Sequence, residues 1–508
     1  MSSRSSLQGL LDLPLRETPG KTAIRTEAVQ VSYQELDLSM RGVASGLQRQ
    51  GVSAGDRVAW FLPNGMEAVV TTLACYQLGA IAVPLNYRYV SEEIGDVLAR
   101  TGSKLLIFHA SRREVVQPLL DSEPTWTAFE VGGADAGFET LHNCDPLSDS
   151  VSVAADHPAL ILFTSGSTGR PKGVVHSHAG AFAGIDISRR VFDFCREDVV
   201  LVGKSISHAG GLQTQLMPTL LVGGEVVLAM KPHPSTAVSL IQAHAVSEYG
   251  LLASDLLDFI EYLEQTPTEL PSLNNAIGSG DCVPQDLHHR FRDLFGWEVM
   301  EGAGMTEVGG YYAANPRDGQ RRWGSLGVAT PDTKIRVIDD TGKDCAVGQT
   351  GEIVLQTPSS TTGYWNDPEA TAELYRDGWL HSGDLGRWDE DGYLWFVARK
   401  KLMIVRRGSN IAPAEIEDVI DEHPAVHASV AVGVKHPEDG QIPVACVALR
   451  GQPEPTIEQQ LRDYVAQHLA AYKNPVHYLF LEQLPRTGTG KFDRHRLQAI
   501  AEQSLGAA

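Results

Sequence analysis

The stretch LFTSGSTGRPKG, from Leu162 to Gly173, is the strongest local signal in this chain. Its glycines allow positive φ angles and a close approach of the backbone to a ligand. Its hydroxyl side chains and Lys172 add donors and a mobile positive charge, and successive N–H groups in such a loop form an anion-binding nest. The apolar run before it predicts a loop at a strand end, and the Walker A pattern GxxxxGK[ST] is absent. A bare Gly/Ser run also fits a flexible surface loop, but the order TSGSTGxPKG favours a phosphate loop.

Composition limits the class of protein. A chain of 508 residues, of which 43% are apolar and 21% charged, is typical of a globular protein with two or more domains. No run of roughly 18 apolar residues predicts a membrane span, and the first residues lack the pattern of a secretion signal. The six cysteines lie far apart without a CxxC pair, which favours a reducing cytoplasm over a zinc site or disulfides.

The charge balance argues against two kinds of partner. Asp and Glu outnumber Lys and Arg by 63 to 42, which gives a net charge of −21. Such a surface repels nucleic acid and anionic membranes. A phosphate ligand must therefore be held by a local arrangement of donors rather than by the overall field.

The order of apolar and amphipathic segments predicts an α/β fold. In the first half, short apolar runs at 58–62, 80–85 and 105–108 alternate with helical patterns at 65–78 and 91–100. This alternation predicts parallel sheets covered by helices.

The pattern changes in the second half. After about Thr330, short strands separated by turn signals predict an antiparallel sheet or small barrel. A small α+β domain is expected from about Arg399. The expected strands are 334–338, 352–355 and 393–397, followed by 429–434, 444–449 and 478–481, and the expected helices are 415–422 and 456–469.

Four further motifs follow the loop: GAGMTE at 302–307, DGWLHSGD at 377–384, ARKKLMIVRRGSNIAPAEIE at 398–417 and PRTGTGKFDR at 485–494. Together with the loop they resemble the motifs of the adenylate-forming (ANL) superfamily of acyl-CoA synthetases, peptide-synthetase adenylation domains and luciferases. The resemblance runs from about residue 20 to the end of the sequence. It implies a large N-terminal domain of helix-covered sheets with a small antiparallel barrel at 1–398. It also implies a small mobile α+β domain at 399–508, with a hinge near 399–402.

The resemblance implies attack of a carboxylate on the α-phosphate of ATP, which releases pyrophosphate and leaves an acyl-adenylate. Because two anions meet, catalysis depends on positioning and charge neutralisation. The implied catalytic residues are Lys491, bridging the carboxylate and the α-phosphate, Thr306 at that phosphate, and Glu307 as the Mg²⁺ ligand. The implied ATP-binding residues are Thr164, Ser165, Gly166, Ser167, Thr168, Gly169 and Lys172 at the outer phosphates, Gly280, Asp281 and Cys282 at the adenine, Thr306, and Asp384 and Arg399 at the ribose.

The acyl site follows from the same resemblance. His208, in SISHAGG, matches a position where many relatives keep an aromatic residue or His beside the acyl group, although a lone His is as readily structural. The other expected residues of the acyl or acceptor site are Asp255, Ala303, Gly304 and Met305. The expected substrate is a small hydrophobic carboxylic acid.

Three positions depart from the family pattern. Ala303 replaces an aromatic residue, so stacking on the adenine is lost or supplied elsewhere. Leu402 stands at the hinge position, which tolerates many residues. Arg407 replaces a glycine at the acceptor channel, and a guanidinium there suits a small anionic nucleophile such as an amino acid.

These features predict an AMP-forming ligase of the cytoplasm that uses ATP and Mg²⁺. The favoured acceptor is an amino acid amine, as in stand-alone amide ligases of the coronafacate ligase type. The alternative is an acyl-CoA synthetase, in which Arg407 meets a phosphate of CoA. A separate carrier protein as acceptor, a non-catalytic nucleotide-binding scaffold and a luciferase-like oxygenase are further alternatives. A homodimer is one option for an oligomeric state that the sequence leaves open.

Overall fold

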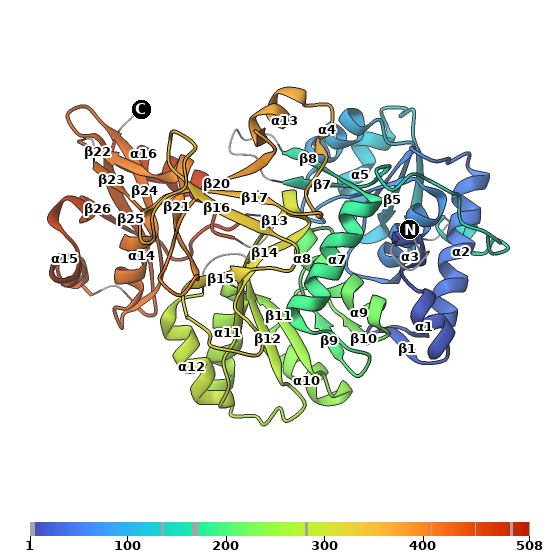
Figure 1. The fold of residues 1–508 in the computed structure, drawn as a ribbon, viewed down its shortest axis with the longest axis horizontal. Helices are drawn as coiled ribbons and strands as arrows, with labels where there is room; N and C mark the ends of the chain where they lie inside the picture. The colour runs from blue at the N-terminus through green and yellow to red at the C-terminus, as the bar shows by residue number, and fades with distance from the viewer. Residues whose placement is uncertain are drawn as a thin grey trace.

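The computed structural model describes residues 6–133, 137–164, 171–279, 283–407, 409–452, 454–487 and 491–506. They form three β-sheets with helices on their faces (Figure 1). Two large sheets are built from the chain up to Arg399, and a small sheet from the residues after it, at the opposite end of the molecule from the N-terminus. The predicted α/β class is confirmed.

The first sheet carries the strands on either side of the predicted phosphate loop. Its order is β18–β8–β7–β4–β3–β5–β6. The strands from β7 to β6 pair in parallel, and β7 turns back into β8 as an antiparallel hairpin. The bounds are β3 Arg57–Phe61, β4 Ile81–Pro84, β5 Leu105–His109, β6 Thr127–Val131, β7 Pro158–Thr164, β8 Lys172–Ser177 and β18 Gly363–Tyr364. β4 is buried along its whole length, as expected of a strand with helices on both faces.

The second sheet has fourteen strands and two halves. The first half is parallel apart from its edge strand β2. It contains β1 Thr22–Arg25, β2 Gln30–Ser32, β9 Val199–Val202, β10 Glu225–Leu228, β11 Glu248–Leu252, β12 Asn275–Ser279 and β13 Met300–Met305. The antiparallel half contains β14 Gly310–Ala314, β15 Ser325–Ala329, β16 Lys334–Ile338, β17 Gly351–Gln356, β19 Tyr375–Arg376, β20 Trp379–Trp388 and β21 Leu394–Arg399.

The change from parallel to antiparallel pairing comes earlier than the sequence predicted. β13 pairs in parallel with β12 and antiparallel with β14, so the switch lies near residue 305 rather than after Thr330. A short helical turn, η4 (Thr306–Val308), ends at Gly309 with φ +61° and reverses the chain. The glycine-rich segment that follows hides β14 from pattern analysis, because glycines weaken a strand signal.

Helices fill the spaces between and outside the two sheets. One core packs α2, α3, α7 and α9 between the sheets, a second packs α10, α11 and α12 on the far face of the second sheet, and a third packs α4 and α5 on the far face of the first. The bounds are α1 Asp12–Glu17, α2 Tyr33–Arg49, α3 Met66–Leu78, α4 Ser91–Thr101, α5 Arg113–Leu120, α6 Glu139–His142, α7 His178–Phe192, α8 Ala209–Gly211, α9 Met217–Val222, α10 Pro234–His244, α11 Ala253–Gln265, α12 Gln285–Phe295 and α13 Pro368–Leu374. No helix within the described ranges is long and apolar enough to cross a bilayer.

The C-terminal sheet has the predicted α+β pattern. Its helices α14 (Pro413–Asp421) and α15 (Ile457–His468) pack on one face, and α16 (Arg494–Ser504) packs on the other. The strands are β22 Ile404–Arg406, β23 Ser409–Ile411, β24 Val426–His436, β25 Gly440–Leu449 and β26 His477–Phe480. A short turn at Lys400–Leu402 separates β21 from β22, at the place of the predicted hinge.

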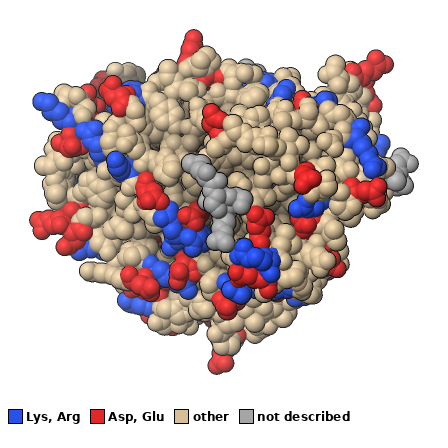
Figure 2. Space-filling model, turned by 45° about the vertical axis from the view of Figure 1, so that its right-hand side comes forward, with Lys and Arg blue, Asp and Glu red and all other residues tan. Residues whose placement is uncertain are grey.

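Charges of both signs lie side by side on the surface. On the face in Figure 2, basic side chains stand among acidic ones rather than in a continuous stripe. Many of them are ion pairs, for example Arg25 with Glu225 and Arg290 with Glu264. The electrostatic potential at a binding site is therefore determined by the nearby side chains rather than by the net charge.

One partly buried ion pair anchors the start of α16. Glu417 on α14 and Arg494 form two N–O contacts of 2.5 and 2.7 Å. Glu417 also accepts the N–H of Ala431 on β24 at 2.7 Å, and Arg494 donates to the carbonyl of Ala431 at 3.2 Å. The pair ties α16, and with it the preceding segment that carries Lys491, to the C-terminal sheet.

We expect Glu417→Gln to lower the free energy of unfolding of the C-terminal sheet by about 2 kcal/mol, because hydrogen bonds to partly buried charges contribute about 1.5–3 kcal/mol. Glu458→Gln is the matched control, since its pair with Arg462 lies on the surface of one helix and is expected to contribute less than about 0.5 kcal/mol. Thermal unfolding of both variants measures the difference, and equal shifts would contradict an anchoring role for Glu417.

Candidate active site

The predicted phosphate loop starts and ends at a hairpin of the first sheet. β7 ends at Thr164 and β8 begins at Lys172, and these two residues pair across the hairpin. The two residues that flank the loop therefore lie at strand ends, as expected. The other predicted loop residues and the predicted adenine-site residues lie outside the described ranges, namely Ser165, Gly166, Ser167, Thr168, Gly169, Gly280, Asp281 and Cys282.

Three hydrogen bonds hold the Thr306–Glu307 segment in place. The Nε2–H of His176 on β8 donates to the carbonyl of Thr306 at 2.7 Å. The N–H of Thr361 donates to the carbonyl of Glu307 at 2.7 Å, and the hydroxyl of Tyr364 donates to its Oε1 at 2.8 Å. Because β8 and β18 belong to the first sheet and Glu307 follows β13, these bonds join the two large sheets.

Lys172 and Glu307 both contact Tyr364. The Nζ of Lys172 lies 4.7 Å from the ring centroid of Tyr364, whose hydroxyl binds Glu307. The structure thus brings together two site residues that are far apart in the sequence. Sequence analysis missed His176, Thr361 and Tyr364, because their roles arise from pairing between segments rather than from a local motif.

Glu307 suits a magnesium ion that is shared with phosphates. Tyr364 donates to Oε1, and no hydrogen bond to Oε2 comes from the residues that the structure describes. Within the described part of the chain no cluster of three His, Cys, Asp or Glu side chains could hold a metal alone. Mg²⁺ commonly binds one or two carboxylates together with substrate phosphates and water, so a single carboxylate fits this ion.

Asp384 and Arg399 face each other across β20 and β21. The Nε of Arg399 lies 2.9 Å from Oδ1 of Asp384, but the pair is not aligned as a hydrogen bond, so this buried oxygen keeps its capacity to accept one. Burial raises the pKa of Asp384, while the charges of Arg399 and Lys491 lower it. An acceptor at this position is suited to a hydroxyl of a ribose.

Lys491 belongs to the C-terminal part, yet its charge acts on Asp384. The carbonyl of Lys491 accepts hydrogen bonds from the N–H and hydroxyl of Thr487 at 2.7 and 3.2 Å. The carbonyl of Thr487 in turn accepts from Arg88 of the large part at 3.3 Å. These contacts dock the Lys491 segment beside the predicted nucleotide site.

The predicted acyl residues differ in their surroundings. The Nε2 of His208 is buried without a hydrogen-bond partner among the described residues, and burial, with a smaller effect of Arg88, lowers the pKa of His208 to about 4. Asp255 lies 3.5 Å from Lys231 as an ion pair. Ala303 and Met305 pack on the antiparallel half of the second sheet. A Cβ on Gly304 would lie 2.4 Å from the carbonyl oxygen of Gly310, so this glycine is required by packing.

Arg407 is already paired with a carboxylate in this conformation, although its side chain stays largely exposed. Its Nε lies 2.6 Å from Oδ1 of Asp439, and its N–H donates to the carbonyl of Asp439 at 2.8 Å. Arg406 binds the other oxygen of the same buried carboxylate at 3.0 Å. The observation that favoured an amino acid acceptor is thereby weakened, because this guanidinium already has an anionic partner.

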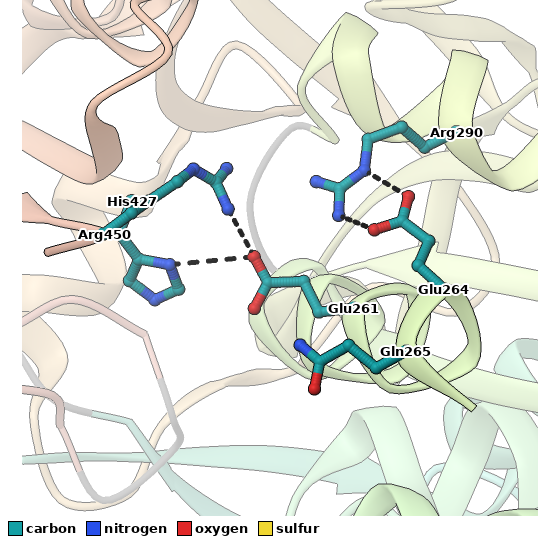
Figure 3. Close-up of a pocket in the computed structure, with 6 residues that line it drawn as sticks. All are labelled: Glu261, Glu264, Gln265, Arg290, His427 and Arg450. Atoms are coloured by element: carbon teal, nitrogen blue, oxygen red, sulfur yellow. Dashed lines mark hydrogen bonds and ion pairs between the residues drawn. The ribbon is translucent and has the colours of Figure 1, made fainter.

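A cavity of about 310 Å³ lies where the C-terminal sheet meets α11 and α12 (Figure 3). Glu261 reaches across it to Arg450 at 2.6 Å and faces His427 at 4.0 Å. Arg290 and Glu264 pair at 2.7 Å on the same side as Glu261. Because each guanidinium here is paired, the cavity is a polar contact between the two parts of the chain and not a candidate catalytic site.

Two family profiles match the chain in the order of these parts. "AMP-binding enzyme" matches residues 12–365, and "AMP-binding enzyme C-terminal domain" matches residues 415–491. The chain belongs to the AMP-binding enzyme family. This AMP-binding enzyme is thus a member of the adenylate-forming superfamily and an AMP-forming ligase, as its motifs predicted.

Its relatives match over nearly the whole length. The enzyme is 34% identical over 488 residues to a feruloyl-CoA synthase of an Amycolatopsis species, covering 95% of this chain and 97% of the relative. It is 32% identical over 492 residues to an indoleacetate–CoA ligase of Aromatoleum aromaticum, covering 93% and 94%.

Solved structures confirm the fold. ATP-bound MatB from Rhodopseudomonas palustris superimposes with a TM-score of 0.91 at 28% identity, covering 98% of this chain and 99% of that one. Apo MatB, at the same identity and coverage, gives a TM-score of 0.79. The arrangement of the AMP-binding enzyme described here is therefore closer to the ATP-bound form of MatB.

We expect His176→Phe to destabilise the fold by about 1–3 kcal/mol near pH 7.5, because the buried carbonyl of Thr306 loses its donor. Burial lowers the pKa of His176 to about 4, below its ordinary value of 6.5. The neutral ring therefore stabilises the fold fully above about pH 6.5, and this stability is lost as the pH falls towards 4.

Unfolding midpoints in urea at about pH 7.5 and about pH 5 test this expectation. The urea midpoint of the wild-type protein should fall from about pH 7.5 to about pH 5, and that of His176→Phe should fall by less. His495→Phe, at an exposed position on α16, is the control and should keep the full decline. The same decline in both variants would show that His176 is not the titrating group.

Proposed function

We propose that this enzyme is an acyl-CoA synthetase. A carboxylate oxygen of the acid attacks the α-phosphorus of ATP, and the bond to the bridging oxygen breaks, which releases pyrophosphate. The sulfur of CoA then attacks the acyl carbon of the adenylate, AMP leaves, and the thiol proton is released. The observation that carries this proposal is the similarity to CoA ligases over nearly the whole chain, including the C-terminal domain.

In this proposal the site residues position and neutralise anions. Thr164, Lys172 and the loop between them hold the outer phosphates of ATP, and Thr306 contacts the α-phosphate. Glu307, fixed by Tyr364, would hold Mg²⁺, which when bound supplies positive charge to the phosphates. Asp384 accepts from the ribose hydroxyls beside Arg399. These assignments extend the family's motif roles, and the contacts among Lys172, Tyr364 and Glu307 support them.

Lys491 is proposed to bridge the attacking carboxylate and the α-phosphate. A compact ammonium can neutralise both groups at once. Its charge already acts on Asp384, which supports a place at the nucleotide. We infer that the domains meet at 398/399, that the described conformation is the one for adenylation, and that rotation about 399–402 produces the thioester-forming state.

CoA is the proposed acceptor, in preference to an amino acid. The relatives favour the alternative that was raised from the sequence, and the pairing of Arg407 with Asp439 weakens the main reason for an amide product. A competition decides between them. Purified protein with Mg-ATP, a panel of carboxylic acids, CoA and mixed amino acids should yield a CoA thioester as the main product by mass spectrometry. An amide as the main product would overturn this proposal.

We expect Lys491→Ala to slow acid-dependent pyrophosphate release by about 100- to 1,000-fold, as removal of one charge-stabilising donor does in other enzymes. Lys435→Ala, at an exposed position on β24, should leave the rate unchanged. Thermal unfolding of both variants controls for folding. A near wild-type rate for Lys491→Ala would exclude the proposed role in adenylation.

A further inference from the structure

A buried lysine lies beside the predicted acyl site. Lys204 follows β9 and is only 9% exposed. Its Nζ donates to the hydroxyl of Ser279, the last residue of β12, at 2.6 Å. A Cβ on Gly210, two residues after His208, would meet only Lys204, at 3.9 Å from its Cδ. The ammonium therefore lies between the SISHAGG segment and the end of β12.

Lys204 has no counter-ion within the described part of the chain. It forms no ion pair there, and Asp255, the carboxylate with the largest effect on its pKa, pairs with Lys231 at 3.5 Å. Glu248, the other carboxylate that acts on the pKa of Lys204, forms no ion pair with it among the described contacts; its Oε2 accepts from Asn275 at 2.9 Å, and burial raises the pKa of Glu248 to about 8. Buried charges in proteins are ordinarily paired, because an isolated one loses its hydration without compensation.

The ammonium also has unused donors. It carries three N–H groups, and Ser279 takes one of them. Burial lowers the pKa of Lys204 to about 8, while the charges of Asp255 and Glu248 oppose this shift, so the group stays protonated near pH 7. Because no carboxylate among the described residues pairs with this amine, it is suited to bind an anion.

Further polar groups lie near this amine. His208, Gly210 and Ser279 are all partly exposed, although Lys204 beneath them is buried. Burial raises the pKa of Tyr311 to about 12, and hydrogen bonds with Ser279 and Thr214 oppose this shift, so its phenol is a neutral donor at the same place. The region therefore offers a cation and hydroxyl groups to a ligand that enters past Gly210.

We propose that Lys204 determines substrate specificity: its ammonium, together with Ser279, binds an anionic group at the far end of the acid, so that the substrate is a dicarboxylic acid or an acid of similar double charge. This inference rests on the proposed function. It replaces the expectation of a hydrophobic acid, because an apolar tail at this place would leave the buried ammonium without a partner.

The test compares matched pairs of acids. Aliphatic and aromatic dicarboxylic acids of several lengths are each assayed beside their monomethyl esters, which keep one carboxylate and lose the distal charge. Pyrophosphate release should show, for the best pair, a kcat/KM about 10- to 100-fold higher for the diacid, because hydrogen bonds to charged groups discriminate by about this factor. Lys204→Met should remove that preference, lowering kcat/KM for the diacid and leaving the ester unchanged or improved.

Two controls separate specificity from folding. Lys231→Met removes a half-exposed lysine that pairs with Asp255 on α11, and this variant should keep the diacid preference. Ser279→Ala retains the ammonium and should reduce the preference only in part. A wild-type preference for esters, or an equal loss for both acids in a folded Lys204→Met variant, overturns the inference alone. If no acid of either kind releases pyrophosphate, the proposed function fails and this inference fails with it.

Discussion

The hydrogen bond from Tyr364 to Glu307 connects the two large sheets at the predicted nucleotide site. Tyr364 lies on the edge strand of the first sheet, beside Lys172, and Glu307 follows the strand at which the second sheet changes from parallel to antiparallel. The distance between the sheets is set by the core of helices α2, α3, α7 and α9. Because protein cores are close-packed and resist shear, this core determines whether the site residues meet at all.

The C-terminal part is attached differently. It has its own apolar cores, and its described contacts with the large part include Arg450 with Glu261 and Arg88 with the carbonyl of Thr487. Polar contacts that are partly open to solvent are individually weak, so they stabilise one position of the C-terminal part but still allow it to move. This is the property required of a domain that first presents Lys491 to the nucleotide and then, as we propose, moves away.

Two polar groups near the proposed acyl site have unused hydrogen-bonding capacity. Among the described residues, the buried Nε2 of His208 has no hydrogen-bond partner and Lys204 has no counter-ion. Such groups destabilise a fold, and native proteins keep few of them. In the function that we propose, bound substrate and nucleotide would complete this hydrogen bonding, while the surrounding helical cores offset the cost.

The sequence by itself determined the α/β class and the family, and it proposed chemical roles for residues in local motifs, such as Lys172, Glu307, Asp384 and Lys491. Those assignments are possible because loops at strand ends and short motifs carry their chemistry in consecutive residues. The sequence could not show that His176 and Tyr364 hold the Thr306–Glu307 segment or that Asp439 pairs with Arg407. Nor could it show that Lys204, beside the predicted acyl site, has no counter-ion among the described residues. Each of these depends on which distant segments pack together, and only the tertiary structure decides that, since burial and pairing are properties of the packed core.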